Sequence, residues 1–122
     1  MLIRYKKAME KIAMGLLSFM PEHKEIKKLM DTMQIYDQQD DWQLYLWKKD
    51  AEYVGAIGVQ LEDSKAIIQH ITVIPSYRGE GVGKEMVSEL CDLDEFEHIS
   101  GINEVQPFIQ KCMNQLKEES TL

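Results

Sequence analysis

Arginine is scarce in this sequence, and basic residues as a whole are outnumbered. The 122 residues include 14 lysines and arginines against 21 aspartates and glutamates, a net charge of −7, and the only arginines are Arg4 and Arg78. Proteins that bind nucleic acid carry a basic surface, usually rich in arginine, that contacts phosphates. This acidic chain is therefore not expected to bind nucleic acid or an anionic membrane surface.

Long apolar runs, a secretory leader and paired cysteines are also missing. No apolar stretch approaches the roughly 20 residues that span a membrane, and the first residues lack an apolar core followed by a cleavage site. Cys91 and Cys112 are expected to be buried thiols. His23, His70 and His98 have no second ligand at the spacing of a metal site, so no metal is expected. These absences favour a cytoplasmic location.

A chain of this length is expected to fold as one domain, residues 1–122. Apolar residues recur at helical spacing in 12–20 and 26–33, and Pro21 is placed in the first turn of the second helix. The polar stretch 36–41 is predicted to be a loop. The other predicted elements are strands at 1–6, Trp42–Trp47, Tyr53–Leu61, Ile67–Ile74 and His98–Gly101, and helices at Lys84–Cys91 and from Pro107 onward.

Glycines are concentrated in one place, directly after the third strand of the predicted meander. Residues 73–84 read VIPSYRGEGVGK. A strand, a glycine-rich loop and a helix start in this order make an anion site. Glycine permits positive φ and close approach of a ligand, and the first N–H groups of the helix point at that ligand. Arg78 adds a guanidinium suited to phosphate.

The loop does not fit two common phosphate-binding motifs. A P-loop requires serine or threonine after Gly-Lys, where this chain has Glu85, and a dinucleotide-binding loop requires glycine at the position of Lys84. Residues 78–83, preceded by Val73-x-Pro75, instead match Gln/Arg-x-x-Gly-x-Gly/Ala. In this they resemble the cofactor motif of the GNAT family of N-acetyltransferases.

That resemblance implies a fold. The order β-α-α-β-β-β-α-β-α is similar to that of the family as far as its fourth helix. It implies an α/β architecture whose sheet is mixed but mostly antiparallel, with helices on both faces and without the hairpin that usually comes last.

The resemblance also implies acetyl-CoA or CoA as the acyl donor, and no metal. The backbone of Ile71, Thr72 and Val73 is expected to contact the pantetheine arm. The remaining cofactor-binding residues that the resemblance implies are Arg78, Gly79, Gly81, Val82, Gly83, Lys84 and Asn103.

Groups for acid and base catalysis are hard to identify. The family commonly uses a tyrosine on the last helix as the acid, but Gln110 stands there and no tyrosine follows Tyr77. The usual base position falls near Ile67 or Gln69. His70 is a weak catalytic candidate, because alternation places it on the opposite face of the strand.

Two functions are compatible with these features. One is an N-acyltransferase acting on an amine of a small molecule or protein. The alternative is a CoA-binding regulatory or interaction module with little turnover. The short chain also resembles small acetyltransferase-like proteins encoded with riboflavin-biosynthesis genes, which implies a link to flavin metabolism.

A homodimer is expected, because without the last hairpin the edge near His98–Gly101 and an apolar stripe on the last helix lose cover. The stripe comprises Phe108, Ile109, Cys112, Met113 and Leu116.

Overall fold

The computed structural model describes residues 1–120, with side chains described for residues 1–118. The strands are β1 (Leu2–Arg4), β2 (Trp42–Lys49), β3 (Glu52–Glu62), β4 (Lys65–Val73) and β5 (His98–Gly101). The helices are α1 (Glu10–Leu17), α2 (Ile26–Gln38), α3 (Val82–Asp92) and α4 (Gln106–Ser120). Short 3-10 turns are η1 (Lys7–Met9), η2 (Pro21–His23) and η3 (Pro75–Tyr77).

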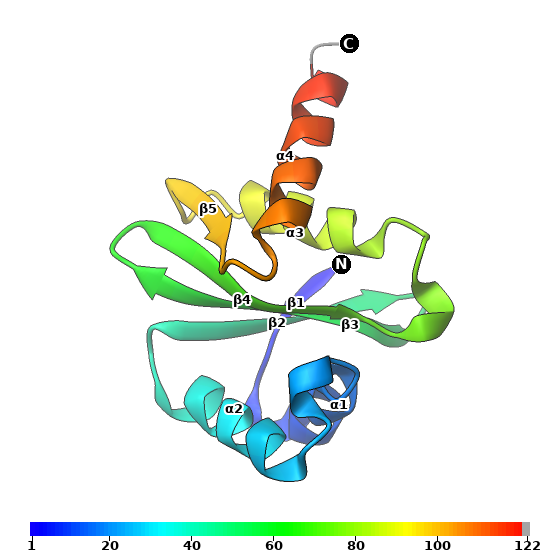
Figure 1. Cartoon of the computed structure of the whole chain (residues 1–122), viewed down its shortest axis with the longest axis vertical. Helices are drawn as coiled ribbons and strands as arrows, with labels where there is room; N and C mark the ends of the chain where they lie inside the picture. The colour runs from blue at the N-terminus through cyan, green and yellow to red at the C-terminus, as the bar shows by residue number, and fades with distance from the viewer. Residues whose placement is uncertain (121–122) are drawn as a thin grey trace.

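The strands form one sheet in the order β1-β2-β3-β4-β5. The first three pairings are antiparallel and the last, β4 with β5, is parallel. Helices α1 and α2 cover one face, and α3 and α4 cover the other (Figure 1). The predicted mixed α/β fold with helices on both faces is therefore confirmed. No helix in residues 1–120 is long and apolar enough to cross a membrane.

Strand β2 shows how the sequence builds two cores. Its consecutive apolar residues alternate between the faces of the sheet. Leu44 and Leu46 are buried against α1 and α2, whereas Tyr45 and Trp47 are buried on the face of α3 and α4. The uninterrupted run of large side chains is thus explained by a strand that is covered on both faces.

Strand β4 is bulged, and it loses its β5 neighbour halfway along. The register with β3 shifts between Gly58 and Val59, which leaves Gln69 unpaired on β4. Pairing with β5 runs only from Lys65 to Ile68, and the hydrogen bond from Ile102 N to Ile68 O (3.1 Å) is the last across this junction. Beyond that point β4 continues with β3 alone on one side, so its other edge is open.

Two local predictions were wrong. Residues 36–38 belong to α2 and not to a loop. Tyr36 is buried, and its packing stabilises the last turn of the helix although the neighbouring residues are polar. Pro21 lies in η2, a separate turn that ends before α2 begins at Ile26. Tyr36 fits only because Gly58 has no side chain, since a Cβ there would overlap the tyrosine hydroxyl.

Candidate functional site

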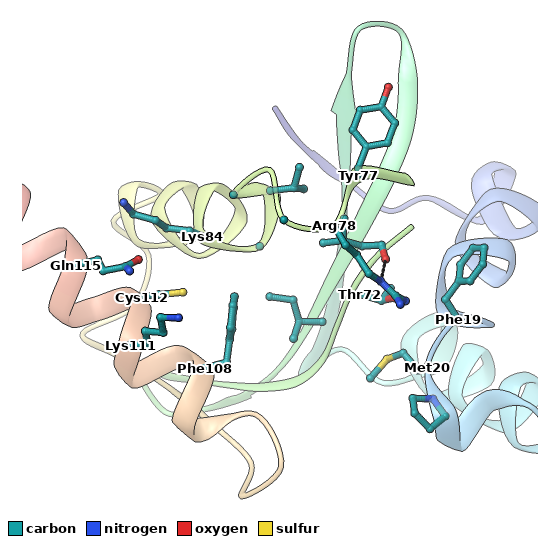
Figure 2. Close-up of a pocket in the computed structure, with 17 residues that line it drawn as sticks. Phe19, Met20, Thr72, Tyr77, Arg78, Lys84, Phe108, Lys111, Cys112 and Gln115 are labelled. Carbon is teal, nitrogen blue, oxygen red and sulfur yellow. Dashed lines mark hydrogen bonds between the residues drawn. The ribbon is translucent and has the colours of Figure 1, made fainter. Parts of the chain in front are cut away.

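A cleft of about 690 Å³ opens at the unpaired edge of β4. Side chains of α4 lie on one side of it and Phe19 and Met20, after α1, on the other, with β4 between them (Figure 2). The start of α3 and its glycine loop close one end. The cleft is lined by Phe19, Met20, Pro21, Ile71, Thr72, Val73, Tyr77, Arg78, Gly79, Gly81, Val82, Gly83, Lys84, Phe108, Lys111, Cys112 and Gln115.

The glycines of the loop serve two different needs. Gly79 and Gly81 have φ of +85° and +82°, with open space where a Cβ would stand, so their backbone conformation is what requires glycine. Gly83 instead allows close packing, because a Cβ there would lie 2.8 Å from Cζ of Phe108. Glu80 is not among the residues that line the cleft, and its Oε1 lies 3.9 Å from Lys49 Nζ.

The open edge of β4 presents backbone groups from alternate residues. Ile74 N donates to Val54 O at 2.9 Å. In an antiparallel pair the groups that face the partner alternate, so Thr72 also faces β3 while Ile71 and Val73 face the open edge. Arg78 Nε donates to Val73 O at 2.9 Å, and the arginine therefore lies along this edge, away from Lys84 (Figure 2).

Nine of the ten cofactor residues predicted from the sequence line the cleft. The exception is Asn103, which is exposed in the turn between β5 and α4 and is not among the lining residues. Arg78 was expected to face phosphate, but its Nε is engaged by β4. Its other guanidinium nitrogens make no hydrogen bond or ion pair with residues 1–120 in this structure.

One wall of the cleft was missed by sequence reasoning. On α4, Phe108, Lys111, Cys112 and Gln115 recur at the three- and four-residue spacing of one helix face. Phe108 and Cys112 were predicted only as members of the apolar stripe, and Lys111 and Gln115 had no assigned role, because only their spacing from that stripe could have revealed them. Lys84, in the first turn of α3, and Lys111, on α4, add two cationic side chains to the lining of the cleft, and the start of α3 itself favours an anion.

His70 lies just after the bulge but outside the cleft, on the face covered by α2. Its Nδ1 shares a 2.6 Å hydrogen bond with the Tyr36 hydroxyl. Burial, followed by the proximity of His23, lowers the pKa of His70 to about 4, against a small opposing effect of Glu22. The imidazole is therefore neutral at physiological pH and a weak base.

Tyr77 does not fill the place of the missing catalytic tyrosine. Although Tyr77 lines the cleft, its hydroxyl points away from the other labelled side chains (Figure 2) and donates to Glu52 Oε2 at 3.0 Å. This hydrogen bond is also the main reason that the pKa of Tyr77 is raised. The α4 wall contributes no tyrosine either.

Known proteins are similar to this chain in sequence or in fold. A model described as the acetyltransferase (GNAT) family matches residues 12–111. A Bacillus methanolicus protein, described as an uncharacterized N-acetyltransferase in the lysA 3' region, is 49% identical over 113 residues, covering 92% of this chain and 94% of the relative.

Two solved structures illustrate the similarity in fold. The ribosomal-protein-alanine N-acetyltransferase from Brucella melitensis biovar Abortus 2308 superposes with a TM-score of 0.69 at 15% identity, over 89% of this chain and 87% of that one. The aminoglycoside N-acetyltransferase AAC(6')-Iy in complex with CoA gives 0.66 at 17% identity, over 95% of this chain and 84% of that one.

Proposed function

Because this chain belongs to the GNAT family of acetyltransferases, we propose that it transfers an acyl group from acetyl-CoA to an amine of a small molecule or protein. The observation that carries the proposal is the cleft itself. It joins a glycine loop at a helix start to an unpaired strand edge in one continuous space.

The residues of the cleft fit the parts of a CoA thioester. The N–H groups at the start of α3, together with the side chains of Lys84 and Lys111 that line the same cleft, suit the phosphates. The backbone of Ile71 and Val73 offers an edge that an extended amide-containing arm can join as an added strand. The thioester, when bound, supplies the activated acyl group.

Proton transfer is the part of the reaction with least support from side chains. An amine must lose a proton before it attacks, and a base with a pKa near neutrality helps. The pKa of His70 is about 4, so we expect the acceptor to enter already deprotonated. Acyl transfer should then rise with pH along the titration of the acceptor amine.

A CoA-binding module with little turnover is the second candidate function. It is favoured by the engagement of Tyr77 with Glu52 and by the lack of a tyrosine on the α4 wall. Release of free CoA thiol from acetyl-CoA over a panel of amines separates the two functions. Including amine-bearing intermediates of riboflavin biosynthesis in that panel tests the predicted flavin link.

Binding of CoA is tested by titration calorimetry with Gly81→Asp. The new carboxylate would lie at the anion site, so we expect binding to weaken at least tenfold, about 1.4 kcal/mol. Gly81→Ala is the matched control, because it puts a side chain at the same positive φ of +82° without adding the carboxylate. Failure of the unaltered chain to bind CoA near millimolar concentration would contradict both candidate functions.

A further inference from the structure

A second group of chemically capable side chains lies on the other face of the sheet. Glu22 and His23 are in η2, and His70 is on β4. One ligand atom from each of the three lies within 4.8 Å of the others. The three line a small cavity of about 280 Å³, together with Lys28, Asp31 and Thr32.

Both imidazoles are held in place through one ring nitrogen. His23 is buried, and its Nδ1 donates to the Leu17 carbonyl oxygen at 3.0 Å. His70 uses its Nδ1 with the Tyr36 hydroxyl at 2.6 Å. Histidines that ligate metals characteristically use their second nitrogen in this way, to a carbonyl or another polar group, which fixes the ring orientation.

The opposite nitrogens, Nε2 of each ring, are the ones left for a ligand. Because Nδ1 of His23 must donate to a carbonyl, its Nε2 carries a lone pair, which now meets the Thr32 hydroxyl at 3.0 Å. A hydroxyl can rotate away and release that lone pair. Within residues 1–120, Nε2 of His70 makes no hydrogen bond. The two rings stand 5.1 Å apart between centroids.

The three ligand atoms must move closer together to bind one ion. Tetrahedral zinc at bond lengths of ~2.0–2.1 Å places its ligand atoms roughly 3.3 Å apart, against the present limit of 4.8 Å. Glu22 is exposed, so its carboxylate is free to change rotamer and close on the two imidazoles.

From this geometry we propose that Glu22, His23 and His70 form a binding site for a transition-metal ion, with Zn²⁺ as the best fit. Zinc accepts two imidazoles and one carboxylate as ligands, whereas Mg²⁺ and Ca²⁺ prefer sites made of oxygen atoms and disfavour imidazole nitrogen. Three protein ligands leave a fourth position open to the cavity. The ion would also tie η2 to β4, next to Pro21 and Ile71 of the CoA cleft.

The test is titration calorimetry of the untagged, chelator-treated full chain with ZnCl₂, independent of any acetyl transfer. We expect one Zn²⁺ per chain with micromolar or tighter affinity, a rise in melting temperature, and no binding of MgCl₂. Co²⁺ in place of Zn²⁺ should give weak visible bands without thiolate charge transfer, which separates this site from one at Cys91 or Cys112.

Single substitutions locate the ligands. Glu22→Gln and His70→Gln should each weaken Zn²⁺ binding at least tenfold, while Glu25→Gln and His98→Gln leave it unchanged. Glu22 is exposed, so its variant should fold even if substitution at His70 disturbs packing. The proposal is overturned if the chain does not bind Zn²⁺ below about 1 mM, or if Glu22→Gln binds it as tightly as the unaltered chain.

Discussion

The imidazole of His70 makes the stability of the chain sensitive to mild acid. Its pKa is lowered from 6.5 to about 4 in the folded state, so between these values the unfolded chain binds the extra proton. The contribution of the neutral imidazole to the free energy of unfolding is complete above pH 6.5 and is lost as the pH falls toward 4. The shift corresponds to about 3 kcal/mol.

We therefore expect urea unfolding at pH 7 and pH 4.5, in the presence of EDTA, to give a much larger loss of stability for the unaltered chain than for His70→Gln. Carboxylates titrate over the same range in both proteins, so the difference between the two is the informative quantity. Equal losses would show that His70 is protonated as easily in the folded state as in the unfolded one.

The folded position of His70 also shows how far single residues could be predicted. Alternation along the strand correctly placed it away from the cleft. Its neighbours could not be predicted, because His23 is 47 positions away in the sequence and reaches His70 only through the packing of η2 beside β4. The spacing rules for metal ligands apply only to residues close in the sequence, so they could not reveal a cluster that tertiary structure brings together.

At the scale of the elements, the separation of β5 from β4 after Ile68 predicts which amides of β4 exchange with solvent. Amides of Ile71 and Val73 face the open edge and should exchange quickly with solvent, whereas the Thr72 amide, facing β3, should be protected. Addition of CoA should slow exchange at 71 and 73 and leave 72 unchanged. Residue-resolved exchange by NMR checks this, and protection of all three amides in the free protein would argue against an open edge.

Most elements were predictable because their signals are local. Periodicity located the helices, alternation located the strands, and the glycine spacing located the loop before α3. The end of α2 could not be predicted, since residues 36–41 are mostly polar and the burial of Tyr36 against Gly58 is a contact between distant parts of the sequence. The α4 wall of the cleft was also missed, because one apolar stripe serves both the core and the cleft.

At the scale of the whole molecule, the structure removes part of the reason for expecting a homodimer, because the apolar stripe on α4 is partly buried within the chain. Ile109 and Cys112 are buried within the chain's own core, at 1% and 2% exposure, whereas Phe108 is 38% exposed. The edge of β5 is short, and its Gly101 N–H is already bonded to Gln106 Oε1 at 2.7 Å. What remains is the outer edge of β5, which pairs with no other strand in residues 1–120.

Sedimentation equilibrium tests this prediction, and a mass of two chains at micromolar concentration is the expected result. Ile109→Glu is unsuitable for mapping the interface, because a charge at a buried position would unfold the chain. A mass of one chain at every concentration would rule the dimer out.

The hydrogen bond between Arg78 and Val73 has a consequence for solubility. An unpaired strand edge can recruit a strand from any partly unfolded chain, which is how ordered aggregates begin. Arg78 occupies a carbonyl that such a strand would need and places a positive charge beside it. Arg78 thus makes the edge a poor template for another polypeptide, and loss of this side chain should make the protein more prone to aggregate whenever the cleft is empty.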